Sequence, residues 1–154
     1  MRYLPLFIFA IIMSCNGQKK AAMKDKNDME VGKEKLTLLL QDNYSGMDVA
    51  ETLVIKDVKG LKSFYSKVNR TRKPGIPVPE VDFTKEMILI HCSGEQMDGK
   101  QVKLSVEEEN DLEVIIRTSV KKTQKSGTSS ALISPFSVYK MPLTSKRIVF
   151  FIKE

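Results

Sequence analysis

From Leu36 onward, apolar and polar residues alternate over short stretches, and this period of two is typical of β-strands with one buried face. Leu36, Leu38 and Leu40 alternate in this way and are expected to share one face. Met87–Cys92 is mostly apolar instead, which predicts a strand buried on both faces. Pro135 lacks a backbone N–H, so it is expected to interrupt a strand at an edge or a bulge. The predicted strands are 36–41, 52–55, 87–92, 102–107, 112–116, 131–139 and 147–152.

The period changes between Val58 and Val68, where apolar residues recur at helical spacing along one stripe. Asp57 precedes this stripe and is expected to cap the first turn with its carboxylate. Arg70 and Arg72 follow it, where positive charge favours the negative end of a helix dipole. One amphipathic helix is therefore predicted.

These elements predict an α+β, mostly β fold, with six or seven antiparallel-dominated strands packed with one amphipathic helix in a single domain, 36–154. The helix is the expected cover for one face of the doubly buried strand. Pro74–Pro79 contains three prolines and is expected to be an extended, stiff connection between helix and sheet. Its proline spacing also fits an aromatic groove, which is the less favoured interpretation.

The first 14 residues have the pattern of a lipoprotein signal peptide. Arg2 gives a basic start, and an apolar run of 11 residues, 3–13, follows. As a helix that run would reach about 16 Å, roughly half of a hydrocarbon core, so it is too short to span a membrane. Ile12-Met13-Ser14-Cys15 resembles the cleavage box of bacterial lipoproteins. We therefore expect lipidation at Cys15, because two or three acyl chains give a stable membrane anchor.

Residues 15–35 are predicted to be the lipidated cysteine and a flexible tether. Gln18–Glu30 mixes both charges and has no aromatic or β-branched residue, so it cannot bury enough apolar surface to fold. The expected location is the bacterial cell envelope, with the anchor in the outer membrane. The periplasmic side is favoured over the cell surface, because acidic residues do not directly follow Cys15.

Charge excludes one class of partner. The chain has a net charge of +6, but residues 36–154 hold 18 basic and 15 acidic residues, a net charge of only +3. A nucleic-acid interface would need basic residues clustered along one face, so nucleic acid is not an expected partner.

Few residues carry candidate chemistry. His91 and Cys92 are adjacent on a predicted strand, so they point to opposite faces and cannot form a dyad. One histidine and one unmodified thiol are too few for a zinc site, so neither a metal nor a cofactor is expected. Glu107–Asp111 lacks the spacing of a calcium loop and is interpreted as a solvated hairpin tip. Loop 121–130 is basic and hydroxyl-rich; it is either a mobile hairpin loop or a contact for an anionic lipid or a partner.

The segment Val78–Ile90 resembles part of a known protein family. Its Pro79-Glu80-Val81-Asp82-Phe83-Thr84-Lys85-Glu86 run is similar to the segment that precedes a buried strand in the C-terminal domain of a protease-complex lipoprotein subunit (PrcB-like). Gly94, Pro135–Pro142 and Ile148–Phe151 match later parts of that pattern, whereas Asp98–Gln101 departs from it. The resemblance covers about residues 50–154 and implies a non-catalytic lipoprotein that helps to assemble or stabilise an envelope protease.

Three functions remain open from the sequence. The first is a membrane-anchored accessory or protein-binding module that is not an enzyme. The second is an envelope hydrolase with a dispersed carboxylate site, formed by Asp82 with Glu80 or Glu86. In the first case Asp82 instead caps a turn and Phe83 enters the core. The third is a carrier of a small ligand or lipid, which would need an apolar cavity.

Overall fold

A computed structural model describes residues 35–97, 101–121 and 131–152 of the chain. These residues form seven strands and one helix in the order β1 Thr37–Asp42, β2 Ala50–Ile55, α2 Val58–Val68, β3 Glu86–Ser93, β4 Gln101–Glu109, β5 Glu113–Lys121, β6 Phe136–Pro142 and β7 Arg147–Ile152. Within the described ranges, no helix has the length and apolar character needed to cross a bilayer.

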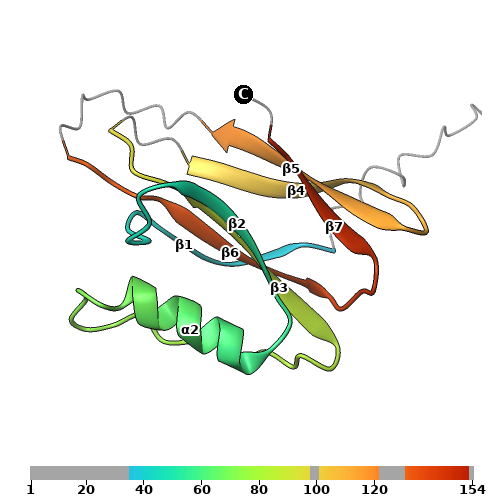
Figure 1. The fold of residues 1–154 in the computed structure, drawn as a ribbon, viewed down its shortest axis with the longest axis horizontal. Coiled ribbons are helices and arrows are strands. Elements are labelled where there is room, and N and C mark those ends of the chain that lie inside the picture. Colours follow the sequence, from blue (N-terminus) through green and yellow to red (C-terminus); the bar gives the residue numbers. More distant parts are fainter. Residues whose placement is uncertain (1–34, 98–100, 122–130, 153–154) are drawn as a thin grey trace, which may run out of the picture.

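The elements pack in three layers (Figure 1). The middle layer is an antiparallel sheet of four strands in the order β1-β6-β3-β2. Helix α2 covers one face of it, and a second sheet in the order β4-β5-β7 covers the other. The chain leaves β5, passes through β6 in the first sheet, and returns to the second sheet as β7, parallel to β5. For the residues that the structure describes, the predicted α+β, mostly β class with one helix is confirmed.

The first core lies between α2 and the middle sheet. Asp57 caps the helix as expected, and its Oδ1 accepts a hydrogen bond of 2.7 Å from the N–H of Gly60. Val58 at the start of the predicted stripe is 51% exposed, but the rest of the stripe is buried. The ring of Phe64 meets Tyr65 and Phe136 edge to face, with centroids 5.6 Å apart in both pairs. The helix therefore covers one face of the sheet, as predicted.

The second core fills the space between the two sheets. Met87 and Leu89 of β3 pack here with the buried residues Leu104, Val114 and Ile116 of the second sheet. Since Ile88, Ile90 and Cys92 of β3 face the helix, this strand is buried on both faces, as its apolar run predicted. Buried side chains thus occupy both interlayer spaces.

The expectation that Leu36, Leu38 and Leu40 share one face was wrong. Leu38 pairs with Tyr139 and Leu40 with Val138, so Leu39 is an extra residue in a β-bulge. The bulge reverses the alternation. Leu36 packs on the second core, Leu40 packs on the first core, and Leu38 is 48% exposed.

The interruption at Pro135 is confirmed, but the expected edge or bulge is not, because Pro135 lies just before β6, a central strand of its sheet. Ile133 and Ser134 form only isolated bridges, with Gln96 and Tyr44, and the regular strand starts at Phe136.

Gly94 follows β3 at a position that only glycine fits. Its φ is +72°, and a Cβ there would lie 2.8 Å from the backbone nitrogen of Ala50.

Candidate functional site

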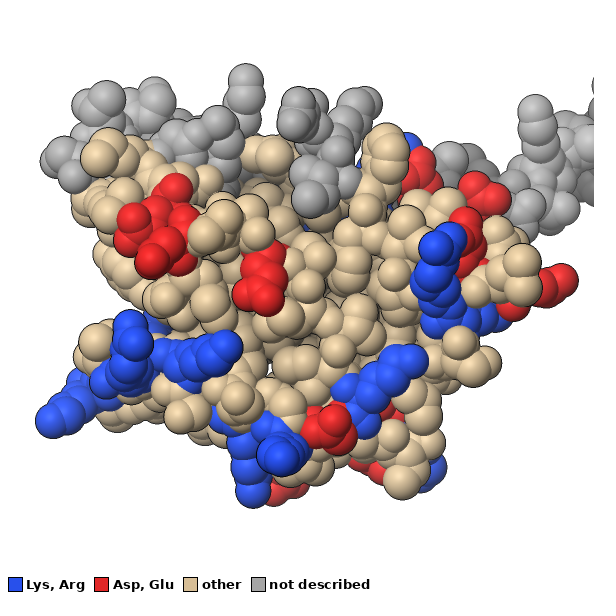
Figure 2. All heavy atoms as spheres, viewed as in Figure 1, with Lys and Arg blue, Asp and Glu red and all other residues tan. Residues whose placement is uncertain are grey.

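The strongest expectation from the sequence, lipidation at Cys15, lies outside the described residues, as do the signal peptide 1–14 and the tether apart from Lys35. Residues 122–130 of the basic loop lie outside them too. On the described face in Figure 2, charges of both signs are spread over the surface, with basic side chains gathered at the lower left around the C-terminal end of α2. The site must therefore be sought within the folded module.

His91 and Cys92 do not form a reactive pair. The Cys92 side chain is fully buried in the first core, and burial raises the pKa of its thiol to about 12. His91 alternates with it and points toward the second sheet, where burial lowers the pKa of the imidazole. Its Nδ1 has no hydrogen-bond partner among the described residues. A thiol that stays protonated at neutral pH is a poor nucleophile, so both residues are part of the packing.

Two of the three carboxylates of the hydrolase hypothesis, Asp82 and Glu86, have partners of their own. Asp82 Oδ1 accepts hydrogen bonds from the Thr84 hydroxyl at 2.6 Å and the Thr84 N–H at 3.1 Å. These bonds, opposed by desolvation and helped by Lys85, hold the pKa of Asp82 below its ordinary value. Glu86 instead forms an ion pair of 2.8 Å with Lys140.

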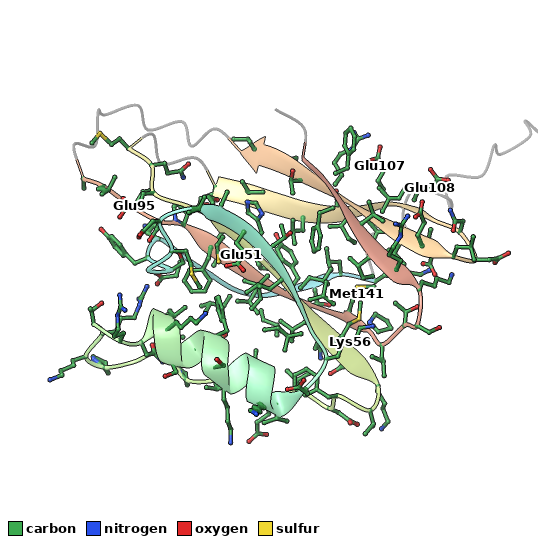
Figure 3. All side chains as sticks on the ribbon, viewed as in Figure 1. Glu51, Lys56, Glu95, Glu107, Glu108 and Met141 are labelled. Carbon is green, nitrogen blue, oxygen red and sulfur yellow. The ribbon has the colours of Figure 1, made fainter. Side chains whose placement is uncertain are left out.

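This geometry fits the turn interpretation of Asp82, whose carbonyl oxygen also accepts from two later N–H groups while Phe83 packs on the first core. A general acid near neutral pH would need a raised pKa. Of the acidic residues labelled in Figure 3, Glu107 and Glu108 are neighbours on β4, whereas Glu51 and Glu95 lie in other parts of the molecule.

The acidic tip between β4 and β5 is balanced by basic residues. Glu107 pairs with Arg117, and Glu109 pairs with Lys35 at 2.7 Å and Lys146 at 2.6 Å. These two lysines, acting against a small desolvation effect, lower the pKa of Glu109. No group of three metal-ligating side chains is present in the described part of the chain.

The open edge of the second sheet is the candidate functional site. Strand β7 pairs with β5 on one side only, and in the described residues no strand pairs with its other side. Ile148 and Phe150 face the second core, so Val149 and Phe151 point outward. Phe151 is 54% exposed. This strand presents a regular row of backbone groups next to apolar side chains.

The other three sheet edges carry features that hinder strand addition. Strand β1 has the bulge at Leu39, and β4 has a bulge near Glu107 together with several charged residues. Strand β2 carries the exposed carboxylate of Glu51. Strand β7 carries a charge at its first residue, Arg147, and from Ile148 to Phe151 it has neither a bulge nor a charge.

The sequence predicted the β7 strand but not its position at an edge. The apolar run Ile148–Phe151 reads equally well as a central strand, because edge and centre differ only in long-range pairing. That β7 lacks the features that hinder strand addition at an edge becomes visible only once the strand order is known.

Comparisons with known proteins returned nothing similar to this chain: no family model, no curated protein and no solved structure matches. The likeness of residues 78–90 to PrcB-like proteins therefore stays a prediction.

Proposed function

We propose that this chain is a bacterial lipoprotein of the outer membrane that acts, without catalysis, as an accessory module binding another envelope protein. The observation that carries the proposal is the open, apolar edge of β7. An extended segment of a partner adds to such an edge through main-chain hydrogen bonds, while alternate side chains give specificity.

The flanking charges favour a foreign segment over a second copy of β7. Lys146 precedes the strand, Arg147 is its first residue and Lys153 follows it; within the chain, Lys146 pairs with Glu109 and Arg147 with Glu113. Two antiparallel copies of β7 would bring these basic ends together, which is unfavourable. A partner strand with apolar residues at alternate positions and acidic residues at its ends complements the edge better.

The anchor at Cys15 serves this function by holding the module at a membrane surface. Residues 16–35 extend at most about 70 Å, so partners within that distance of the bilayer are in reach. The likeness to PrcB-like proteins supports an envelope protease complex as the partner. A hydrolase based on Asp82 is less well supported, because its carboxylate is held in a turn.

Photo-crosslinking in intact cells tests the proposal. Benzoylphenylalanine replaces Phe151 on β7, or Val58 on α2 as a control of similar exposure. We expect a discrete crosslinked product with a second protein from position 151 and none from position 58. Products of equal yield from both positions, or none from position 151, would contradict the proposal.

A matched pair of variants separates edge pairing from simple proximity. Val149→Lys adds a charge to the β7 edge, and Val54→Lys makes the same change on the β2 edge, where Val54 is 38% exposed. Only Val149→Lys should abolish the crosslink from position 151, and melting curves check that both variants fold. Retention of the crosslink in Val149→Lys would show that β7 does not pair with the partner.

A further inference from the structure

A second surface, distant in sequence from β7, forms a concave cleft of about 320 Å³. It lies where α2 ends against the loop that follows β1 and the segment that precedes β6. The basic side chains gathered at the lower left of Figure 2 surround this end of the helix. The residues that matter here are Tyr44, Lys67, Arg70, Thr71, Arg72 and Ser134.

The side chain of Arg72 is held in place in this cleft by Asp42 and Tyr44. Its guanidinium pairs with both carboxylate oxygens of Asp42, and Nη2 donates to the carbonyl oxygen of Tyr44 at 2.5 Å. Burial opposes ionisation of Asp42, but the hydrogen bond and charge of Arg72, with the N–H groups of Tyr44 and Asn43, outweigh it and lower the pKa of Asp42. The carboxylate therefore stays ionised and balances the charge of Arg72.

The positive charges of Lys67 and Arg70 are not balanced by any carboxylate that the structure describes, unlike the charge of Arg72. Neither has a carboxylate partner within the described residues, although both line the cleft. The end of α2 offers them about half a negative charge. Two basic side chains thus leave the cleft with a surplus of roughly one and a half positive charges after the helix end is counted.

The cleft also holds buried donors that lack acceptors. The Ser134 hydroxyl, in a residue only 7% exposed, accepts N–H groups from Ser45 and Gly46, which leaves its own proton free to donate. Arg72 Nε is buried without a partner in the described part of the chain. Ser134 lines the cleft, whereas Arg72 Nε is closed off from solvent, so of these two groups only the Ser134 hydroxyl can offer a donor to an occupant of the cleft.

We propose that this cleft binds an acidic segment of a protein, with a carboxylate between Lys67 and Arg70 and a neighbouring residue against the half-exposed ring of Tyr44. The volume of about 320 Å³ lies at the lower end of the range for small-ligand sites and is enough for one or two side chains. A bilayer is a nearly flat surface and fits a concave cleft poorly, so a protein segment is favoured over lipid headgroups. This site is independent of the β7 edge.

The test uses the full chain in detergent and a fluorescent hexaglutamate peptide, with inorganic phosphate and glycerol 1-phosphate as competing probes. Lys67→Gln combined with Arg70→Gln removes the two cleft charges. Lys59→Gln combined with Lys62→Gln is the matched control, because it removes the same charge from exposed positions on the same helix.

We expect the peptide to bind the native chain and the control pair equally. The cleft pair should bind it about tenfold or more weakly, the size expected for lost charge-assisted hydrogen bonds. Equal weakening in both pairs would show only general charge attraction and overturn the proposal. So would an absence of peptide binding, or stronger binding of glycerol 1-phosphate than of the peptide. Since neither pair alters β7, crosslinking from position 151 stays an independent result.

Discussion

At the scale of single residues, burial makes the two most reactive side chains of the module inert. Cys92 is fully buried, and its thiol has a pKa of about 12. We expect a thiol reagent at neutral pH to leave Cys92 unmodified in the folded chain and to modify it after denaturation. Peptide mass spectrometry measures this, and rapid labelling of Cys92 in the folded protein would contradict its position in the first core.

Protonation of His91 is expected to make the free energy of unfolding depend on pH. Burial lowers the pKa of the folded imidazole below the ordinary value of 6.5, so the unfolded chain binds the proton more readily. The free energy of unfolding should therefore be fully retained above pH 6.5 and decrease as the pH falls below it.

His91→Phe removes this titration and keeps an aromatic ring between the sheets. Denaturant titrations of both proteins between about pH 7 and pH 5 measure the difference. The native chain should lose more stability than the variant over that range. Equal losses would mean that His91 is not desolvated in the folded state.

At the scale of elements, what the sequence could predict was local. The sequence signals of α2 are its N-cap residue, its apolar stripe and its C-terminal end, and all lie within about a dozen neighbouring residues. The apolar run of β3 predicted directly that this strand is buried on both faces. The bulge at Leu39, the parallel pairing of β5 with β7, and the Asp42–Arg72 ion pair depend on residues far apart in the chain. No periodicity encodes such pairings, so both candidate binding surfaces were missed.

The cap of α2 gives a prediction at the same scale. Asp57→Ala removes the acceptor for the N–H of Gly60 and should lower the free energy of unfolding by about 1 kcal/mol. Asp57→Ser keeps a capping oxygen and should restore most of that loss. Denaturant titration compares the three proteins, and equal stability of the alanine and serine variants would contradict the capping role.

At the scale of the whole molecule, the proposal joins a membrane anchor to a module with two binding surfaces. We expect the mature protein to begin at Cys15 and to carry two or three acyl chains there. Mass spectrometry of the N-terminal peptide measures this directly. A peptide with an unmodified Cys15, or one that still includes residues 1–14, would contradict the anchor.

The central claim is that the edge of β7 pairs with a partner strand in the envelope. Amide hydrogen exchange, measured on the chain in its native membranes and again after purification, tests it most directly. The account predicts slower exchange within Arg147–Ile152 in the membranes, with exchange in α2 the same in both samples. Unchanged exchange in β7, with protection confined to another element, would contradict the account.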